Sequence, residues 1–322
     1  MARRKKKADI PVKTRPETWQ EALEEFLLLK RAQGRAERTL KDYVYYVNQF
    51  FNRYPNIWPD VSLMKKAVYD YLSQENISNS AFNLRRANLN SFFNFCVQEE
   101  ILPSNPINGI QRKKDSGRII HIDDDYIRKL LKLPDQTTYS GLRDYCFLLL
   151  TLDTGIRPSE AYQLKVSDFD FKLKQVTIQQ NISKTRTQRI LPLSQVTVSA
   201  FKKLFAARPA DWKDDAPALC TNQGTPLNNK TWRLRLASYV KELGIHITPY
   251  SLRHVFALGF LRNEGNVFAL QKMLGHTTLD MSKRYVALSG RDLQEQHEYA
   301  SPLNTFLPKP KSRVQKIKKK KK

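Results

Sequence analysis

The stretch from residue 250 to residue 285 decides how this chain is interpreted. It reads Tyr250-Ser251-Leu252-Arg253-His254, continues through Leu274-Gly275-His276 and ends at Arg284-Tyr285. An arginine of this kind is able to hold a phosphate by two parallel hydrogen bonds. The histidine follows a glycine that ends a helix, and the tyrosine lies nine residues later on a basic helical segment. Phosphoryl transfer through a covalent tyrosine needs groups of these kinds.

The charge of the chain favours a polyanionic partner. Its 322 residues include Lys+Arg 55 against Asp+Glu 31, which gives a formal net charge of +24. Five of the basic residues lie in residues 3–7 and nine in residues 309–322, and neither segment contains an acid. A basic run at a terminus is as often a solvated tail as a binding arm. The remaining excess of about ten charges in the body exceeds what solubility requires and indicates nucleic acid.

Several classes of protein are not expected. No apolar run approaches the roughly 20 residues that cross a bilayer, so we expect a cytoplasmic, nucleoid-associated protein with no membrane partner. Cys96, Cys146 and Cys220 are widely spaced without a C-x-x-C pair, which predicts neither a disulfide nor a zinc site. No P-loop and no carboxylate cluster for two metals stands out, which agrees with chemistry that needs no metal and no cofactor.

Helical periodicity and breaks in it divide the chain. Four helices are predicted, after Thr18 with a capping-box Glu21, after Thr39, and over residues 63–72 and 79–99. A segment with prolines, glycines and the basic run Arg112-Lys113-Lys114 follows. The expected organisation is a basic tail (1–17), a helical DNA-binding domain (18–102), a basic linker (103–118), a second domain (119–300), and a C-terminal segment with a basic tail (301–322).

The second domain is predicted to be mainly helical with one small hairpin. A helix follows Asp123, and an apolar helix covers residues 145–152. Two short strands, at residues 176–178 and 189–193, flank the polar turn 183–187. Further helices are expected at 232–243, 252–263, 267–274 and 281–288. The fold class is therefore α+β, mainly α with a small β-hairpin.

Two further basic residues fit a phosphate site. Arg157 follows Thr154-Gly155 at the start of a helix, where the macrodipole favours an anion rather than a cation. A phosphate bound at this helix start would explain why an arginine stands there, with Glu160 supporting its guanidinium. The alternative is an ordinary surface ion pair of Arg157 with Glu160. Lys184 lies in the hairpin turn, which suits entry into a groove, although a surface lysine is the commoner explanation for a lysine in a turn.

Together these motifs resemble the tyrosine recombinases, the family of phage integrases, Xer recombinases and Cre, over about residues 18–300. The T-G-x-R-x-x-E motif of the family places its first catalytic arginine at Arg157, with Glu160 as support. The lysine of its β-hairpin falls at Lys184, and Arg186 is an alternative. The H-x-x-R and L-G-H motifs imply catalytic roles for Arg253 and His276, with His254 as support, and the nucleophile is Tyr285.

One position departs from the family pattern. The first histidine of H-x-x-R, which the family uses for proton handling or phosphate binding, is Tyr250 in this chain. A phenol donates hydrogen bonds but is a poor proton acceptor at neutral pH. The resemblance therefore implies Tyr250 as a hydrogen-bond donor to the phosphate, with more of the catalytic burden on Arg157, Arg253 and His276.

The resemblance also implies partners and a reaction. The two domains would form a C-shaped clamp on double-stranded DNA, with a homo-tetramer acting on two inverted-repeat core sites. Residues 297–307, which include Tyr299, Leu303, Phe306 and Leu307, are candidates for docking on a neighbouring protomer or on their own domain. Candidate DNA contacts are Lys41, Arg53, Arg85, Arg86, Arg112, Lys113, Lys114 and Arg186.

The predicted function is a site-specific recombinase that works through a 3′-phosphotyrosyl intermediate, and its predicted role is that of the integrase or transposase of a mobile element. A type IB topoisomerase, a weakened or inactive DNA-binding relative, and a plain basic nucleic-acid-binding protein remain as alternatives. The topoisomerase shares the chemistry but not the compact four-helix domain with the L-G-H motif. The plain binding protein explains the charge and leaves the motifs as coincidence.

Overall fold

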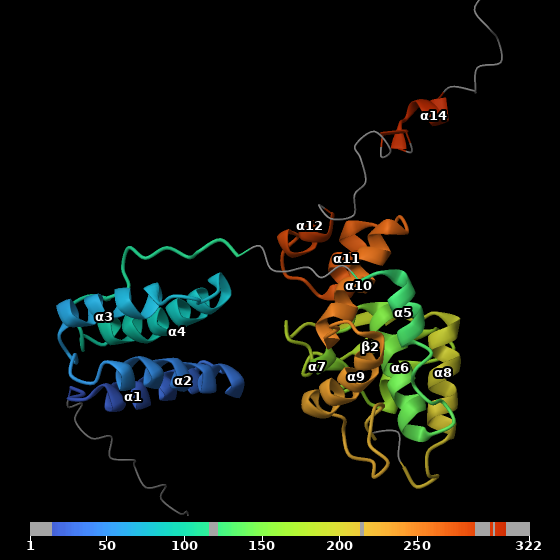
Figure 1. The fold of residues 1–322 in the computed structure, drawn as a ribbon, viewed down its shortest axis with the longest axis horizontal. Coiled ribbons are helices and arrows are strands. Elements are labelled where there is room, and N and C mark those ends of the chain that lie inside the picture. Colours follow the sequence, from blue (N-terminus) through green and yellow to red (C-terminus); the bar gives the residue numbers. More distant parts are fainter. Residues whose placement is uncertain (1–14, 116–121, 213–215, 287–296, 299, 307–322) are drawn as a thin grey trace, which may run out of the picture. The chain divides into compact units, whose positions relative to one another are not determined.

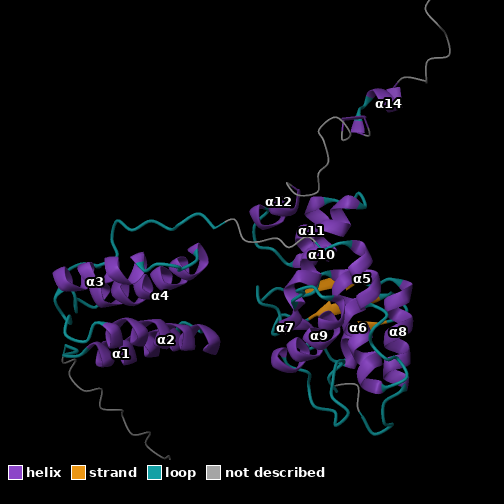
Figure 2. Ribbon diagram, viewed as in Figure 1, coloured by secondary structure: helices purple, strands orange, loops and turns teal. Residues whose placement is uncertain are grey.

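A computed structural model of the chain describes residues 15–115, 122–212, 216–286, 297–298 and 300–306. The chain divides into two compact units, Met1–Arg118 and Ile119–Lys322 (Figure 1). Helices dominate both units, and the strands lie in the second (Figure 2). The predicted class, mainly α with a small β element, is confirmed.

The first unit contains four helices, α1 (Trp19–Ala32), α2 (Glu37–Arg53), α3 (Val61–Ser73) and α4 (Asn79–Gln98). Thr18, Asp60 and Ser78 begin α1, α3 and α4, because their side-chain oxygens accept backbone N–H groups that the helix leaves unpaired. Helix α2 begins at Glu37, earlier than the predicted start after Thr39. The Glu21 carboxylate accepts from the backbone nitrogen of Glu17, one residue earlier than a capping box requires.

Aromatic side chains fill the core of the first unit. Phe26, Phe50, Phe51, Phe92 and Phe93 are almost fully buried and meet mostly edge to face. The chain after α4 also packs on this core.

The beginning of the predicted linker is ordered by this packing. Ile107 is 1% exposed, and the amide of Asn105 donates to Asn90 and Asn94 at 3.0 and 2.7 Å. The Asn83 amide donates to the Lys113 carbonyl and accepts from its N–H. The segment up to Lys113 is therefore held against the four helices.

The second unit packs helices around a small antiparallel sheet. Its elements are α5 (Asp124–Leu130), α6 (Tyr139–Thr154), α7 (Pro158–Ala161), a 3-10 turn (Val166–Asp168), β1 (Phe169–Asp170), β2 (Gln175–Ile178), β3 (Arg189–Pro192), α8 (Gln195–Ala206), α9 (Asn229–Leu243), α10 (Pro249–Arg262), α11 (Val267–Leu274), α12 (Asp280–Val286) and α14 (Leu303–Phe306). The strand order is β1-β2-β3, with Val176 opposite Leu191. The strand β1 was not predicted, because two residues are too few to show a period.

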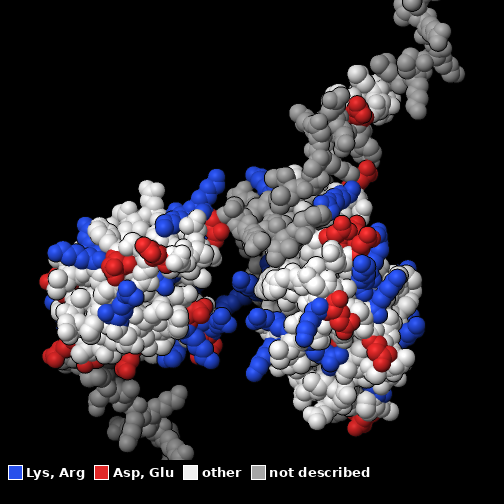
Figure 3. Space-filling model, viewed as in Figure 1, with Lys and Arg blue, Asp and Glu red and all other residues white. Residues whose placement is uncertain are grey.

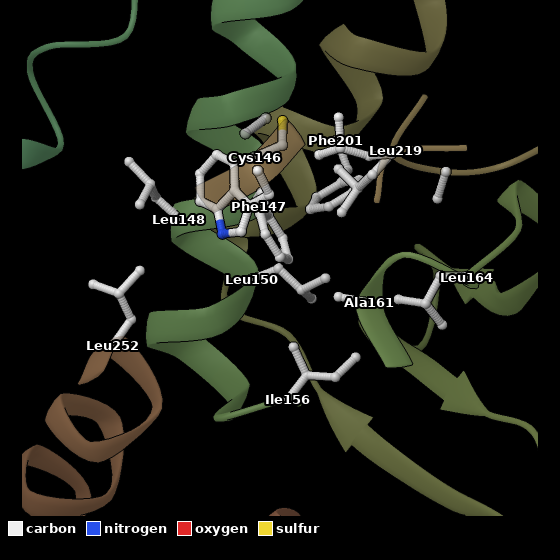
Figure 4. Close-up of a cluster of buried hydrophobic side chains, with 14 of the residues drawn as sticks. Cys146, Phe147, Leu148, Leu150, Ile156, Ala161, Leu164, Phe201, Leu219 and Leu252 are labelled. Atoms are coloured by element: carbon white, nitrogen blue, oxygen red, sulfur yellow. The ribbon is translucent and has the colours of Figure 1, made fainter. Parts of the chain in front are cut away.

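The main core of this unit surrounds α6. Phe147 lies edge-on to Trp232 of α9 with ring centroids 4.3 Å apart, and Leu150 and Ile156 extend the cluster toward the sheet (Figure 4). Cys146 and Cys220 are free buried thiols, as Cys96 is in the first unit. A separate small core joins α10, α11 and α12, and Tyr285 is one of its members.

Among the described residues, no helix combines the length and apolar character needed to cross a membrane. The same part of the chain contains no group of three or more His, Cys, Asp or Glu side chains arranged to hold a metal ion.

Candidate active site

The turn after α6 places the first arginine. Gly155 ends the helix with φ +63°, and a Cβ there would lie 2.3 Å from the ring of Phe256 and 2.7 Å from Leu274. Only glycine fits both the left-handed conformation and this close approach. The chain then turns into α7, where Arg157 is the N-cap residue and Pro158 the first helical residue. The guanidinium of Arg157 is thereby directed into the unit, where it is 7% exposed.

Three arginines converge on the end of α11. Arg157 Nη2 donates to the carbonyl of Gly275 at 2.8 Å, Arg189 Nε to that of Met273 at 3.1 Å, and Arg253 Nη2 to that of Leu274 at 2.7 Å. These carbonyls are consecutive, and the last carbonyls of a helix are otherwise unpaired and carry partial negative charge. One helix end therefore anchors all three guanidinium groups, which come from α7, β3 and α10.

Gly275 makes this approach possible. It ends α11 with φ +61°, and a Cβ there would lie 3.2 Å from Arg157 Nη1 and 3.3 Å from Arg189 Cζ. The glycine of the L-G-H motif therefore serves the backbone turn and leaves room for two arginines.

Glu160 is the carboxylate at the centre of this cluster. It is fully buried, and it accepts from Arg157 Nη1 at 3.0 Å and from Arg189 Nη1 at 3.2 Å. Burial alone would raise the pKa of its carboxyl group, but the hydrogen bonds and charges of Arg189 and Arg157 hold that pKa below its usual value. Glu160 is therefore ionised, and it supports two arginines rather than the one predicted.

Positive charge is in excess at Arg253. Its guanidinium is 5% exposed and also donates to the Gly155 carbonyl at 2.6 Å, but no carboxylate pairs with it among the described residues. Burial and the nearby charge of Arg157 lower the pKa of Arg253 to about 9. An anion placed beside these arginines would offset the excess, and a phosphodiester is such an anion.

His276 is a neutral imidazole whose tautomer can be assigned. Arg253 Nη2 lies 3.2 Å from His276 Nε2, and an arginine only donates, so Nε2 accepts. The other nitrogen, Nδ1, then carries the hydrogen and donates to Ser282 Oγ at 2.9 Å. Burial, followed by the charges of Arg253, Arg157 and Arg189, lowers the pKa of His276 to about 4.

Tyr285 lies beside this cluster on α12. Its side chain is 5% exposed and packs in the small core with Phe256 and Leu274. Its hydroxyl lies 2.6 Å from Nδ1 of His254, the residue that follows Arg253. The structure therefore places the predicted nucleophile, the second arginine and both histidines together.

Two predicted residues lie at the edge of the site. Tyr250, in the first turn of α10, is 53% exposed. Lys184 is exposed on the loop between β2 and β3, as is Arg186, which adopts a positive φ of 53°. A pocket of about 520 Å³ opens beside this loop and is lined by Thr185, Arg189 and His276. The loop that carries Lys184 thus borders the arginine cluster.

The candidate DNA contacts of the first unit differ in how they are held. Lys41 is exposed, while Arg53 lies 3.6 Å from Asp70 in an exposed pair. Arg85 donates to the Tyr71 carbonyl at 2.9 Å, and Arg86 to the Ile110 carbonyl at 2.6 Å. The run that ends this unit is exposed and consists of Arg112, Lys113 and Lys114.

Sequence reasoning missed Arg189 and Ser282. The sequence pattern predicts Arg189 only as the first residue of a strand, although a charged side chain there is unusual for a strand that packs on a core. Ser282 lies three residues before Tyr285, and it is fully buried. A buried serine in that position needs a polar partner, which His276 supplies.

The fold and this site define a family of enzymes. Residues 121–291 match the model of the phage integrase family. The chain therefore belongs to that family, and its class is that of the tyrosine recombinases, enzymes that break and rejoin DNA.

Individual relatives agree with this assignment. Tyrosine recombinase XerC of Yersinia pestis is 30% identical and aligns over 69% of this chain and 73% of its own length. Tyrosine recombinase XerA of Pyrococcus horikoshii is 27% identical over 88% of this chain and 95% of its own length. The structure of the Tn1549 transposon integrase in complex with transposon right end DNA has the same fold, with a TM-score of 0.70, 18% identity, and coverage of 88% of this chain and 99% of that one.

Proposed function

We propose that this chain cleaves and rejoins duplex DNA through a 3′-phosphotyrosyl intermediate. The observation that carries the proposal is the convergence of Arg157, Arg189 and Arg253 on one helix end, next to His276 and the hydroxyl-bearing end of Tyr285. Three cations around one carboxylate leave positive charge for a phosphate, and a tyrosine beside them supplies a nucleophile.

The proposed reaction follows from these positions. The Tyr285 oxygen attacks the scissile phosphorus in line with the departing 5′ oxygen. Arg157 and Arg253 stabilise the non-bridging oxygens as negative charge develops on them. Lys184, on the loop bordering the site, protonates the departing oxygen, and attack by a 5′ hydroxyl of a second duplex reverses the step. The phosphotyrosyl bond conserves the energy of the phosphodiester during the exchange.

We propose double-stranded DNA with inverted-repeat core sites as the partner, held in a C-shaped clamp by the two units and acted on by a homo-tetramer at two sites. The remaining body charge supports this partner. The proposed phosphate contacts are Lys41, Arg53, Arg85, Arg86, Arg112, Lys113, Lys114 and Arg186. The segment proposed to dock on a neighbouring protomer includes α14; Tyr299 and Leu307 of that segment lie outside the described residues.

We further propose that the chain serves a mobile element as its integrase or transposase. The departure of Tyr250 from the histidine of the family motif supports a specialised role over a housekeeping one. Cells that carry the gene with its flanking DNA should form the joined ends of an excised circle, detected by outward-facing amplification. A Tyr285→Phe strain that forms the same junction would contradict the role.

A nicked suicide substrate tests the chemistry. The nick lies beside the scissile phosphate, so a short strand diffuses away and the covalent complex is trapped. Wild-type protein should form a protein–DNA adduct that denaturing electrophoresis detects, and Tyr285→Phe should form none. That variant loses one hydrogen bond, worth about 1 kcal/mol, so it should remain folded. Equal adduct from both proteins would exclude Tyr285 as nucleophile, and DNA binding without an adduct from either would favour a binding-only relative.

A further inference from the structure

The hydroxyl of Tyr285 has a histidine partner that the family motif does not assign to it. His254 Nδ1 lies 2.6 Å from that hydroxyl, and the two rings are 5.7 Å apart between centroids. Tyr250, in the motif position that the family uses for proton handling, has a side chain 53% exposed. His254 is therefore in direct contact with the hydroxyl of the proposed nucleophile.

We propose that His254 is the proton acceptor for Tyr285 during DNA cleavage and returns that proton during rejoining. This inference rests on the proposed phosphotyrosyl reaction and names one of its catalytic groups. Its basis is the direct contact of the imidazole with the reacting oxygen, at a distance short enough for proton transfer.

The protonation state of His254 suits this role. Burial, and then the charge of Arg253, lower the pKa of His254 below the ordinary histidine range. The titratable groups that interact with it are Arg253 on its own helix, His276 after α11, and Tyr285 on α12. The first is a cation, which disfavours a second positive charge on the imidazole. A neutral imidazole with hydrogen on Nε2 leaves the lone pair of Nδ1 for the Tyr285 hydroxyl.

The proton balance closes over both steps. In cleavage, the bond from Tyr285 oxygen to phosphorus forms, the bond from phosphorus to the 5′ oxygen breaks, and the tyrosine proton moves to His254 Nδ1. The 5′ oxygen takes its proton from Lys184. In rejoining, a 5′ hydroxyl gives its proton to Lys184 and attacks phosphorus, while His254 returns its proton to the departing tyrosine. No external acid, base or metal enters this sequence.

Two substitutions test whether His254 accepts a proton or is only an anchor, a residue that holds the Tyr285 hydroxyl in place by a hydrogen bond. In His254→Asn, the amide oxygen lies near the position of Nδ1 and still accepts the hydroxyl, but it does not take up a proton. His254→Ala leaves space for added imidazole. Both variants should reduce single-turnover cleavage of the suicide substrate by about 10²–10³-fold, because general base catalysis is typically of that size. Imidazole should restore the alanine variant, with a rate that follows the neutral form of the added base.

The pH profile gives a second measurement. Wild-type cleavage should fall as the pH drops below the lowered pKa of His254, because protonation removes the acceptor. His254→Asn should lack this acidic limb. If His254→Asn cleaves within about threefold of wild type and keeps the limb, His254 is only an anchor and the inference is wrong. Thermal melting checks folding, and if His254→Ala does not fold, the asparagine variant alone decides.

Tyr250→His tests the competing site for the same role. In the His254→Asn background, adding Tyr250→His should leave single-turnover cleavage as slow as in His254→Asn alone. A double variant that cleaves about tenfold faster than His254→Asn, or more, would transfer the role to position 250. These outcomes differ from a failure of the proposed function itself. In that case, wild-type protein would form no more covalent adduct than Tyr285→Phe does.

Discussion

Arginines in the two compact units donate to backbone carbonyls in the same way, yet their arrangements differ. In the first unit, Arg85 and Arg86 bind the carbonyls of Tyr71 and Ile110 separately. In the second, three arginines bind three consecutive carbonyls at the end of one helix. A hydrogen bond to a carbonyl therefore does not mark a site. The convergence of several buried positive charges around one carboxylate does.

The surface gives a weaker signal than this convergence. On the face shown in Figure 3, Lys and Arg side chains are interspersed with Asp and Glu over the described part of each unit. Exposed charges are screened by water and salt, whereas the buried guanidiniums of the second unit are screened much less. Substitutions at and near these side chains test the difference between solitary and convergent arginines.

Removing one convergent arginine should have the largest effect. Arg253→Ala should slow single-turnover cleavage at saturating DNA by about 10²–10³-fold, since one donor to the developing charge is lost. The matched substitution in the first unit is Arg86→Ala. It should lower the free energy of unfolding by about 1 kcal/mol and weaken DNA binding, without slowing the covalent step. Equal losses in the covalent step would remove the distinction between the two arrangements.

Crowding the convergent arginines should have an intermediate effect, and the chain provides a control. Gly275 and Gly244 both end helices with positive φ, at +61° and +64°. A Cβ at Gly244 meets nothing within 4 Å, whereas one at Gly275 meets Arg157 and Arg189. Both alanine variants should lose about 1 kcal/mol of stability from backbone strain. Only Gly275→Ala should lose cleavage as well, and an equal loss in both would show that strain alone matters.

The smallest effect concerns the stability of the site in acid. The pKa of His276 is lowered to about 4, against about 6.5 in an unfolded chain. As the pH falls through this window, the unfolded state binds a proton that the folded state does not, so the free energy of unfolding decreases. His276→Gln should flatten the fall of melting temperature between about pH 6.5 and 4.5. The pKa of His254 is lowered as well, so part of the fall of melting temperature with acid should remain in this variant.

Glu160 affects the free energy of unfolding at a more acid pH than His276 does. Its carboxyl pKa is lowered, so its contribution to stability is present above the ordinary carboxyl range and is lost at more acid pH. An unchanged slope in His276→Gln above pH 4.5 would contradict the assignment of His276 as a buried neutral group.

Much of this site was predictable from the sequence because side chains with unusual positions mark it. Arg157 lies at a helix start, where the macrodipole disfavours a cation, and Arg253 stands at the arginine of the H-x-x-R motif. The helices that carry them show clear periods and caps, and the structure brings both arginines together with His276 and Tyr285.

The rest was hidden for physical reasons. Tyr285 is both a core residue and the predicted nucleophile, so a choice between the two from its helical spacing was not possible. Arg189 lies at the start of a strand, and its direction depends on the sheet register. The acceptors at the end of α11 are backbone groups, which have no signature in the sequence.

Because the acceptors at the end of α11 are backbone carbonyls, the site responds differently to substitutions and to insertions. The spacing of three carbonyls at a helix end is set by peptide geometry, so it does not depend on which side chains stand at Met273 and Leu274. Substitutions there alter packing and leave the acceptors in register. One inserted residue in α11, by contrast, rotates its end by about 100° and moves every acceptor at once. The charge geometry of the site is thus robust to substitution and sensitive to length.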